Sequence, residues 1–202
     1  MSARWEWRVF APSLSAVRAR LAAEMGGGSD ERQYQFYLVG PCARRNVKAQ
    51  EHGVDVKTLV ETERGLERWR PDGCTPFPLP AEWVRQALPA HLDLGPIAVD
   101  EPMDDRDTLV RRVVGPHPEI DAVAVRKQRR RHACGDVLAE HAALIVAGVD
   151  LETAAVEGED ADLVLEWVAR LGLDAWPNES WVRRLQKLLG RVYEPLESRA
   201  GC

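Results

Sequence analysis

The chain has 202 residues, of which 45% are hydrophobic, and its formal net charge at pH 7 is -5. This composition excludes general disorder and predicts one domain, spanning residues 1–202, with a sizeable core. The acidic balance argues against indiscriminate nucleic-acid binding, although an acidic protein can still carry a concentrated basic site.

Cysteine usage and hydropathy indicate a reducing compartment. The four cysteines show no CxxC pairing, and the N-terminal region has no apolar run typical of a signal peptide or a membrane span. We therefore expect unpaired thiols, a cytoplasmic location and no membrane partner. A zinc site built from these scattered cysteines would lack the ligand spacing that such sites usually show.

Alternating residues predict a strand at the N-terminus, followed by a helix. Over residues 4–10, Glu6 and Arg8 share one face, and apolar residues occupy the other. A helix is expected over residues 12–25. The glycines that follow lack the spacing of a phosphate-binding loop, so we interpret residues 26–32 as a flexible loop.

Four further strands are predicted before residue 71. They cover residues 33–40, 45–50, 54–63 and 66–70. The second and third of these have a polar face with a cation at its centre, Lys48 and Lys57. Most such faces are solvated, but the opposite apolar faces need a cover, which favours an enclosed sheet.

The rest of the chain is predicted to contain both strands and helices. The proline-rich residues 71–80 lead into the first of these helices. We expect helices over 81–88, 105–114, 160–171 and 178–189, the last capped by Asn178, and strands over 122–132, 137–146 and 151–157. Residues 191–202 are interpreted as a tail.

Alternating cations in the strand over residues 122–132 are the most informative local pattern. Successive side chains of a strand point to opposite faces, so Lys127, Arg129 and Arg131 share one face. The other face carries Arg126 and Arg130. One of these two cation rows is expected to point inward.

Many antiparallel strands with one polar face and one helix-covered apolar face predict an α+β fold. A closed β-barrel with helices packed outside satisfies this pattern, because closure removes exposed strand edges. The interior of such a barrel would be polar.

These residues give the chain a resemblance to CYTH-domain proteins, members of the triphosphate tunnel metalloenzyme superfamily that includes class IV adenylate cyclases and thiamine triphosphatases. The resemblance covers most of the chain and is strongest in its second half. There Val125-x-Lys127-x-Arg129, Glu140, Glu157 and the segment 178–190 follow the order usual in the family. In the first half, Lys48 and Lys57 resemble the paired basic strands of the family.

The resemblance implies an eight-stranded antiparallel tunnel in which cations hold a triphosphate and glutamates hold Mg²⁺ or Mn²⁺. Phosphate oxygens favour charge-assisted bonds from several directions, and hard divalent cations favour carboxylate oxygens. The residues implied in phosphate binding are Arg8, Lys48, Lys57, Lys127, Arg129 and Arg131. Those implied as metal ligands are Glu6, Glu140 and Glu157, with Glu159 as a further candidate, and the catalytic set is Glu6, Glu157 and Lys127.

The N-terminal strand departs from the family pattern. The family signature E-x-E-x-K corresponds here to Arg4, Glu6 and Arg8. Arg4 replaces a residue that would help to bind metal, and an arginine cannot ligate Mg²⁺. This substitution puts catalysis in doubt.

Three functions follow from these patterns. The first is a metal-dependent, triphosphatase-like phosphohydrolase acting on a triphosphate-bearing small molecule or inorganic polyphosphate. The second is a non-catalytic module that binds a polyanion or nucleotide, and the third is a class IV-type nucleotidyl cyclase. No sequence-specific nucleic-acid binding is expected, and a homodimer is compatible with each function.

Overall fold

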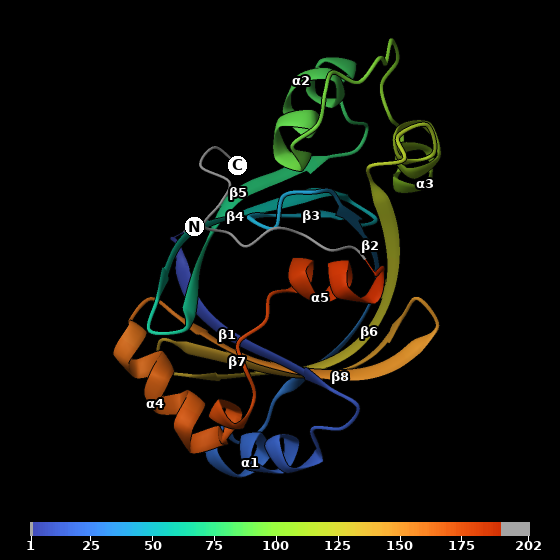
Figure 1. The fold of residues 1–202 in the computed structure, drawn as a ribbon. Coiled ribbons are helices and arrows are strands. Elements are labelled where there is room, and N and C mark those ends of the chain that lie inside the picture. The colour runs from blue at the N-terminus through green and yellow to red at the C-terminus, as the bar shows by residue number, and fades with distance from the viewer. Residues whose placement is uncertain (1, 191–202) are drawn as a thin grey trace. The chain divides into compact units, whose positions relative to one another are not determined.

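The computed structural model describes residues 2–190, whose strands form a closed barrel (Figure 1). The strand order is β1-β5-β4-β3-β2-β6-β7-β8. The strands are β1 (Arg4–Ala11), β2 (Ser29–Val39), β3 (Arg45–Ala49), β4 (Gly53–Glu63), β5 (Leu66–Pro76), β6 (Asp121–Cys134), β7 (Val137–Val146) and β8 (Val149–Gly158). The predicted α+β fold with a closed, eight-stranded antiparallel barrel is confirmed.

Among residues 2–190, five α-helices connect or follow the strands. They are α1 (Ser15–Met25), α2 (Ala81–Leu92), α3 (Arg106–Leu109), α4 (Ala161–Leu171) and α5 (Trp181–Leu188). A π-helical segment, Val110–Val114, continues α3, and a 3₁₀ turn, Leu173–Ala175, follows α4. No helix among residues 2–190 has a stretch long and apolar enough to cross a membrane. The predicted tail at 191–202 lies outside the described residues.

Two strands extend into segments for which the sequence predicts other structure. Because β2 begins at Ser29, residues 29–32 of the predicted loop are strand. Gly28 packs closely on β6, since a Cβ atom there would lie 2.5 Å from the carbonyl oxygen of Arg131. β5 continues through the proline-rich segment to Pro76. A proline can belong to a strand, although it lacks the backbone N–H that would donate a hydrogen bond to the neighbouring strand.

The described residues divide into two compact units. The first contains residues 2–34, 59–70 and 125–180, and the second contains residues 35–58, 71–124 and 181–190. Four strands, β2, β4, β5 and β6, contribute residues to both units.

The core of the first unit lies between its strands and the helices α1 and α4. Trp5 and Val9 of β1 pack with Leu21 of α1 and Trp167 of α4. These β1 residues alternate with Glu6 and Arg8, so the helices cover one face of the sheet and the other is charged. Asp160 caps α4 by accepting hydrogen bonds from the backbone nitrogens of residues 162 and 163.

In the second unit, α2 and α5 pack on opposite faces of β2, β3 and β4. Leu38 and Val47 join Leu88 of α2 in one hydrophobic core. Tyr37 points to the other face and stacks on Trp181 of α5, with a distance of 4.9 Å between ring centroids. The helix α5 therefore lies over the polar face of these strands.

Candidate functional site

The pairing of β1 brings the predicted site residues of the first unit onto one face. Glu6 of β1 lies opposite Glu157 of β8, and Arg8 lies opposite Ala155. On the next strand pair, Ala155 lies opposite Glu140 of β7. Directly opposed residues share a face of a sheet, so these residues form one surface, which we call the charged face.

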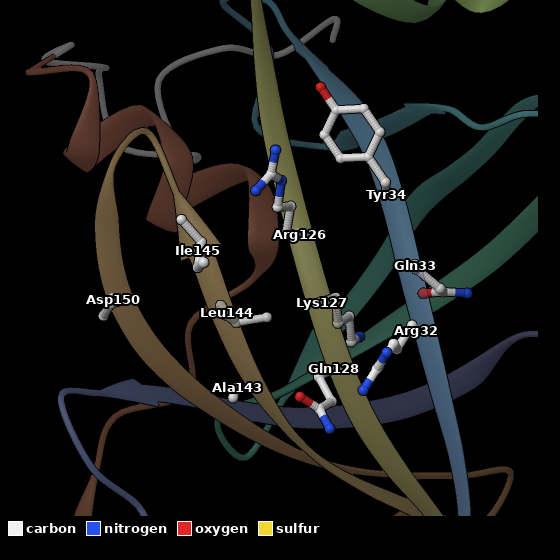
Figure 2. Close-up of a pocket in the computed structure, with 10 residues that line it drawn as sticks. All are labelled: Arg32, Gln33, Tyr34, Arg126, Lys127, Gln128, Ala143, Leu144, Ile145 and Asp150. Atoms are coloured by element: carbon white, nitrogen blue, oxygen red, sulfur yellow. The ribbon is translucent and has the colours of Figure 1, made fainter.

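The strand β6 adds cations to the same face. Arg131 lies opposite Glu140, and Arg129 and Lys127 follow at intervals of two residues. Figure 2 shows Lys127 between Arg126 and Gln128 on β6, beside β2 and β7. The inward cation row predicted from the sequence is therefore the one that contains Lys127.

Arg8 is buried between two carboxylates. Its Nε atom lies 2.9 Å from Glu6 Oε1, and its Nη1 atom lies 2.8 Å from Glu140 Oε1. Burial alone would lower the pKa of Arg8, but the charges of Glu6 and Glu140 outweigh that effect and raise it. Arg8 is therefore a fixed positive charge at the centre of the charged face.

Glu140 is the point where three cations of the charged face meet. Besides Arg8, it accepts hydrogen bonds from Lys127 Nζ at 2.7 Å and from Arg129 Nη1 at 3.2 Å. Burial disfavours its ionised form, yet Lys127 and Arg8 hold the pKa of Glu140 well below its usual value. Its charge organises the cations around it.

Lys127 is the most easily titrated of these cations. Burial lowers the pKa of its amine to about 8, against the opposing effect of Glu140 and with further lowering by Arg8 and Arg129. Lys127 thus begins to lose its charge just above neutral pH in the unliganded protein.

Small residues make room for these long side chains. Ala142 lies opposite Arg129, and Ala155 lies opposite Arg8 and Glu140. Both alanines are buried. Larger side chains at these positions would compete with the guanidinium groups for the same space.

Two carboxylates of the site were not predicted from the sequence. Glu67 of β5 is buried and lies directly opposite Glu6. Glu31 of β2 lies 2.6 Å from Arg129 Nη2 and 3.9 Å from Arg131 Nη1. Glu31 was not recognised as a site residue because the sequence predicts a loop over residues 26–32. Glu67 can be recognised as one only when the pairing of β5 with β1 is known.

Asn178 supports β1 and is not a helix cap. Its Oδ1 atom accepts a hydrogen bond from the Arg8 backbone nitrogen at 2.8 Å, and its Nδ2 donates to the carbonyl oxygens of Glu6 and Gly65. The helix begins only at Trp181. The predicted N-cap is therefore wrong, because the Asn178 side chain satisfies strand and turn groups instead.

The remaining predicted phosphate-binding residues, Lys48 and Lys57, belong to the second unit. Lys48 Nζ lies 3.6 Å from Asp55 Oδ2, and Lys57 lies opposite Asn46. Tyr37 is opposite Lys48, so these groups are on the face of β2, β3 and β4 that also carries α5.

The charged face does not offer a ready site for a divalent cation. Mg²⁺ and Mn²⁺ need several oxygen ligands around one point, but the guanidinium of Arg8 lies between Glu6 and Glu140. Glu157 faces Arg4 at 3.6 Å. Among residues 2–190, the group of three side chains whose ligand atoms converge within 4.8 Å is His52, Asp55 and Cys74, which includes none of the predicted metal ligands.

Comparison with solved structures finds the same barrel in distant proteins. The PH1012 protein from Pyrococcus horikoshii OT3 has 11% sequence identity and a TM-score of 0.53, over 92% of this chain and 99% of that chain. An adenylate cyclase candidate, bh2851 from Bacillus halodurans, has 12% identity and a TM-score of 0.51, over 89% of this chain and 95% of that chain.

HpAC1 from Hippeastrum, an adenylyl cyclase candidate described as having a dominant triphosphatase activity, has 11% identity and a TM-score of 0.52. The match covers 96% of this chain and 99% of that chain. No protein-family model and no curated protein matches this chain. The resemblance stated from the sequence is thus confirmed at the level of the fold, because this chain shares its barrel with these solved structures.

Proposed function

We propose that this chain binds a triphosphate-bearing small molecule or inorganic polyphosphate on the charged face of the first unit. The observation that carries this proposal is the convergence of Arg8, Lys127 and Arg129 on Glu140. Several cations are held close together on a largely buried carboxylate, and a chain of phosphates can meet such an array from several directions.

The chemistry of the ligand follows from the spacing of the charges. The cations extend along β6 at every second residue, from buried Lys127 to half-exposed Arg131. A linear run of phosphates suits a linear run of cations better than a single phosphate does. We therefore expect affinity to rise with the number of linked phosphates.

Thermal unfolding tests this proposal. Tripolyphosphate is expected to raise the melting temperature of the protein, because a ligand that binds only the folded state stabilises it. Orthophosphate at equal total phosphate serves as the control for general ionic effects. Equal shifts with both anions, or no shift with tripolyphosphate, would contradict a triphosphate site.

Metal-dependent hydrolysis is the second candidate function. The triphosphatase activity described for HpAC1, which shares this fold, favours it, as does the partly exposed carboxylate of Glu157 on the same face. In a hydrolase, Glu6, Glu140 and Glu157 would hold Mg²⁺ or Mn²⁺. This arrangement requires Arg8 to leave its position between Glu6 and Glu140. The geometry therefore supports binding more directly than turnover.

A product assay separates the two candidates. Phosphate and pyrophosphate release from tripolyphosphate, ATP and thiamine triphosphate would be measured with and without Mg²⁺ or Mn²⁺, for the wild type and for Glu157→Gln. Metal-dependent release that the variant loses would establish hydrolysis, and pyrophosphate with a cyclic product from ATP would indicate a cyclase. Binding of tripolyphosphate without formation of any product would support a non-catalytic binding protein.

A further inference from the structure

The charged face contains a row of three glutamates on adjacent strands. Glu67 of β5 lies opposite Glu6 of β1, and Glu6 lies opposite Glu157 of β8. Carboxylates in such positions repel one another unless donors or cations lie between them. The negative charges of the row therefore need to be balanced, and a divalent cation is one group that could balance them.

In this chain each glutamate of the row already has an ion-pair or hydrogen-bond partner of its own. Arg4 Nη1 lies 3.6 Å from Glu157 Oε1, Arg8 Nε lies 2.9 Å from Glu6 Oε1, and the indole of Trp69 donates to Glu67 at 3.2 Å. Two of these partners are arginines that keep their charge at any working pH.

A divalent cation would have to displace these partners to enter the row. Arg8 is buried and joins Glu6 to Glu140, so its displacement would leave a buried guanidinium without its counter-charges. Separating one partner from a buried, hydrogen-bonded pair is strongly unfavourable. Arg4 adds a second positive charge beside Glu157, which further opposes cation entry.

We infer that Arg4 and Arg8 take the place of a divalent cation in this chain, so that triphosphate binding is independent of metal. This inference rests on the proposed function for its ligand but not for its statement about metal. Arg4 is the partly exposed member of this pair of arginines. Its replacement is therefore expected to open the Glu157 end of the row to a cation while Arg8 stays between Glu6 and Glu140.

Direct metal binding tests the inference without any activity assay. Uptake of Mn²⁺ would be followed by electron paramagnetic resonance for the wild type, Arg4→Glu and Arg4→Gln, with Arg111→Glu as a charge-matched control at an exposed position of the second unit. The wild type and the control are expected to leave Mn²⁺ free. Arg4→Glu is expected to bind it stoichiometrically, and Arg4→Gln more weakly.

Circular dichroism would verify that each variant folds. Stoichiometric Mn²⁺ binding by the wild type would overturn the inference, and so would the absence of any gain in both Arg4 variants. Calorimetric titration with tripolyphosphate in EDTA tests whether the ligand binds without metal. The wild type is expected to bind tripolyphosphate in EDTA. Binding that appears only when Mg²⁺ is added would also overturn the inference. If tripolyphosphate binds under no condition, the proposed function fails while the Mn²⁺ result still decides the question of metal.

A separate surface of the first unit carries a second inference. The large exposed hydrophobic side chains among residues 2–190 are Tyr34, Ile145 and Val149. Tyr34 and Ile145 line a hollow of about 550 Å³ between β2, β6 and the β7–β8 hairpin (Figure 2). Arg126 lies 5.8 Å from the Tyr34 ring centroid. Exposed apolar groups gathered in this way mark an interaction surface.

The charges of this surface are arranged symmetrically about its apolar centre. Arg126, Ile145 and Asp150 lie directly opposite one another on β6, β7 and β8, so a cation and a carboxylate flank the isoleucine. A two-fold axis through Ile145 would bring Arg126 of each copy to Asp150 of the other. We propose that the partner of this surface is a second copy of this chain.

Sedimentation analysis tests the dimer. The wild type is expected to dimerise and Ile145→Glu to be monomeric. Arg126→Asp and Asp150→Arg should each weaken association, and the double variant should restore it, while Arg111→Asp in the second unit should change nothing. A monomeric wild type, or no restoration in the double variant, would overturn this proposal.

Discussion

Glu140 illustrates how one largely buried charge can determine the properties of a site. Its carboxylate satisfies Arg8, Lys127 and Arg129, so replacing it with the isosteric glutamine leaves buried cations without their counter-charge. We expect Glu140→Gln to lower the free energy of unfolding by about 3–5 kcal/mol. Glu61→Gln, which alters an exposed pair with Arg68, should cost less than about 1 kcal/mol. Denaturant unfolding measures both, and equal costs would contradict the role given to Glu140.

The same carboxylate makes stability depend on acid. The pKa of Glu140 is lowered well below its ordinary value of 4.5 in the folded protein, so the unfolded chain takes up the proton first as the pH falls. The stability that Glu140 contributes is present above about pH 4.5 and is lost as the pH falls through its folded pKa. Denaturant unfolding across this range should show a steep loss in the wild type, and a slope that persists unchanged in Glu140→Gln would contradict this origin.

Lys127 is expected to make the affinity for the ligand fall as the pH rises, whereas Glu140 makes stability fall as the pH decreases. Burial lowers its pKa to about 8, so deprotonation above that pH removes a positive charge from the phosphate site. Affinity for tripolyphosphate is expected to fall between about pH 7 and pH 9. Lys127→Arg keeps its charge over this range, so the variant should show a smaller fall. Parallel pH profiles for the two proteins would exclude Lys127 as the titrating group.

At the scale of elements, Asn178 links the approach to α5 with the strand that carries Glu6 and Arg8. It bonds to the backbone of both residues and to Gly65 in the β4–β5 turn. Asn178→Ala removes these bonds, with an expected cost of roughly 1–3 kcal/mol, and should weaken tripolyphosphate binding by loosening β1. Asn178→Asp keeps the acceptor for the Arg8 nitrogen and should retain more of the binding. Calorimetry would compare them, and equal affinities in both variants and the wild type would show that Asn178 has no positioning role.

The elements were predictable to the extent that their patterns are local. The alternation over residues 4–10 and the cations of residues 127–131 identify strands and their faces, and β7 matches its predicted range of 137–146. Glu67 was missed because its importance depends on which strand lies beside β1, and strand pairing is a long-range property. The displaced start of α5 has a similar cause, since tertiary bonds to β1 occupy the asparagine expected to cap it.

For the whole molecule, the barrel explains how a chain with a net negative charge can offer a cationic site. Closing the sheet directs one face of β1, β6, β7 and β8 away from α1 and α4, and the cations gather there around Glu140. The fold itself was predictable because its apolar faces needed helices and its polar faces needed enclosure. The balance of charges on the charged face was not predictable, because it depends on side-chain partners from six different strands, β1, β2, β5, β6, β7 and β8.

The central claim is that the charged face binds triphosphates, and adjacent residues of β6 provide its most direct test. Arg129 lies on this face beside Glu140, whereas Arg130 points to the opposite face and is half exposed. Calorimetric titration of tripolyphosphate into Arg129→Ala and Arg130→Ala, in EDTA, compares the two faces with the same change of charge. Affinity at least tenfold weaker for Arg129→Ala, equivalent to about 1.4 kcal/mol, with Arg130→Ala close to the wild type, is the predicted result. Equal losses in the two variants would contradict the site, because they would show attraction by overall charge alone.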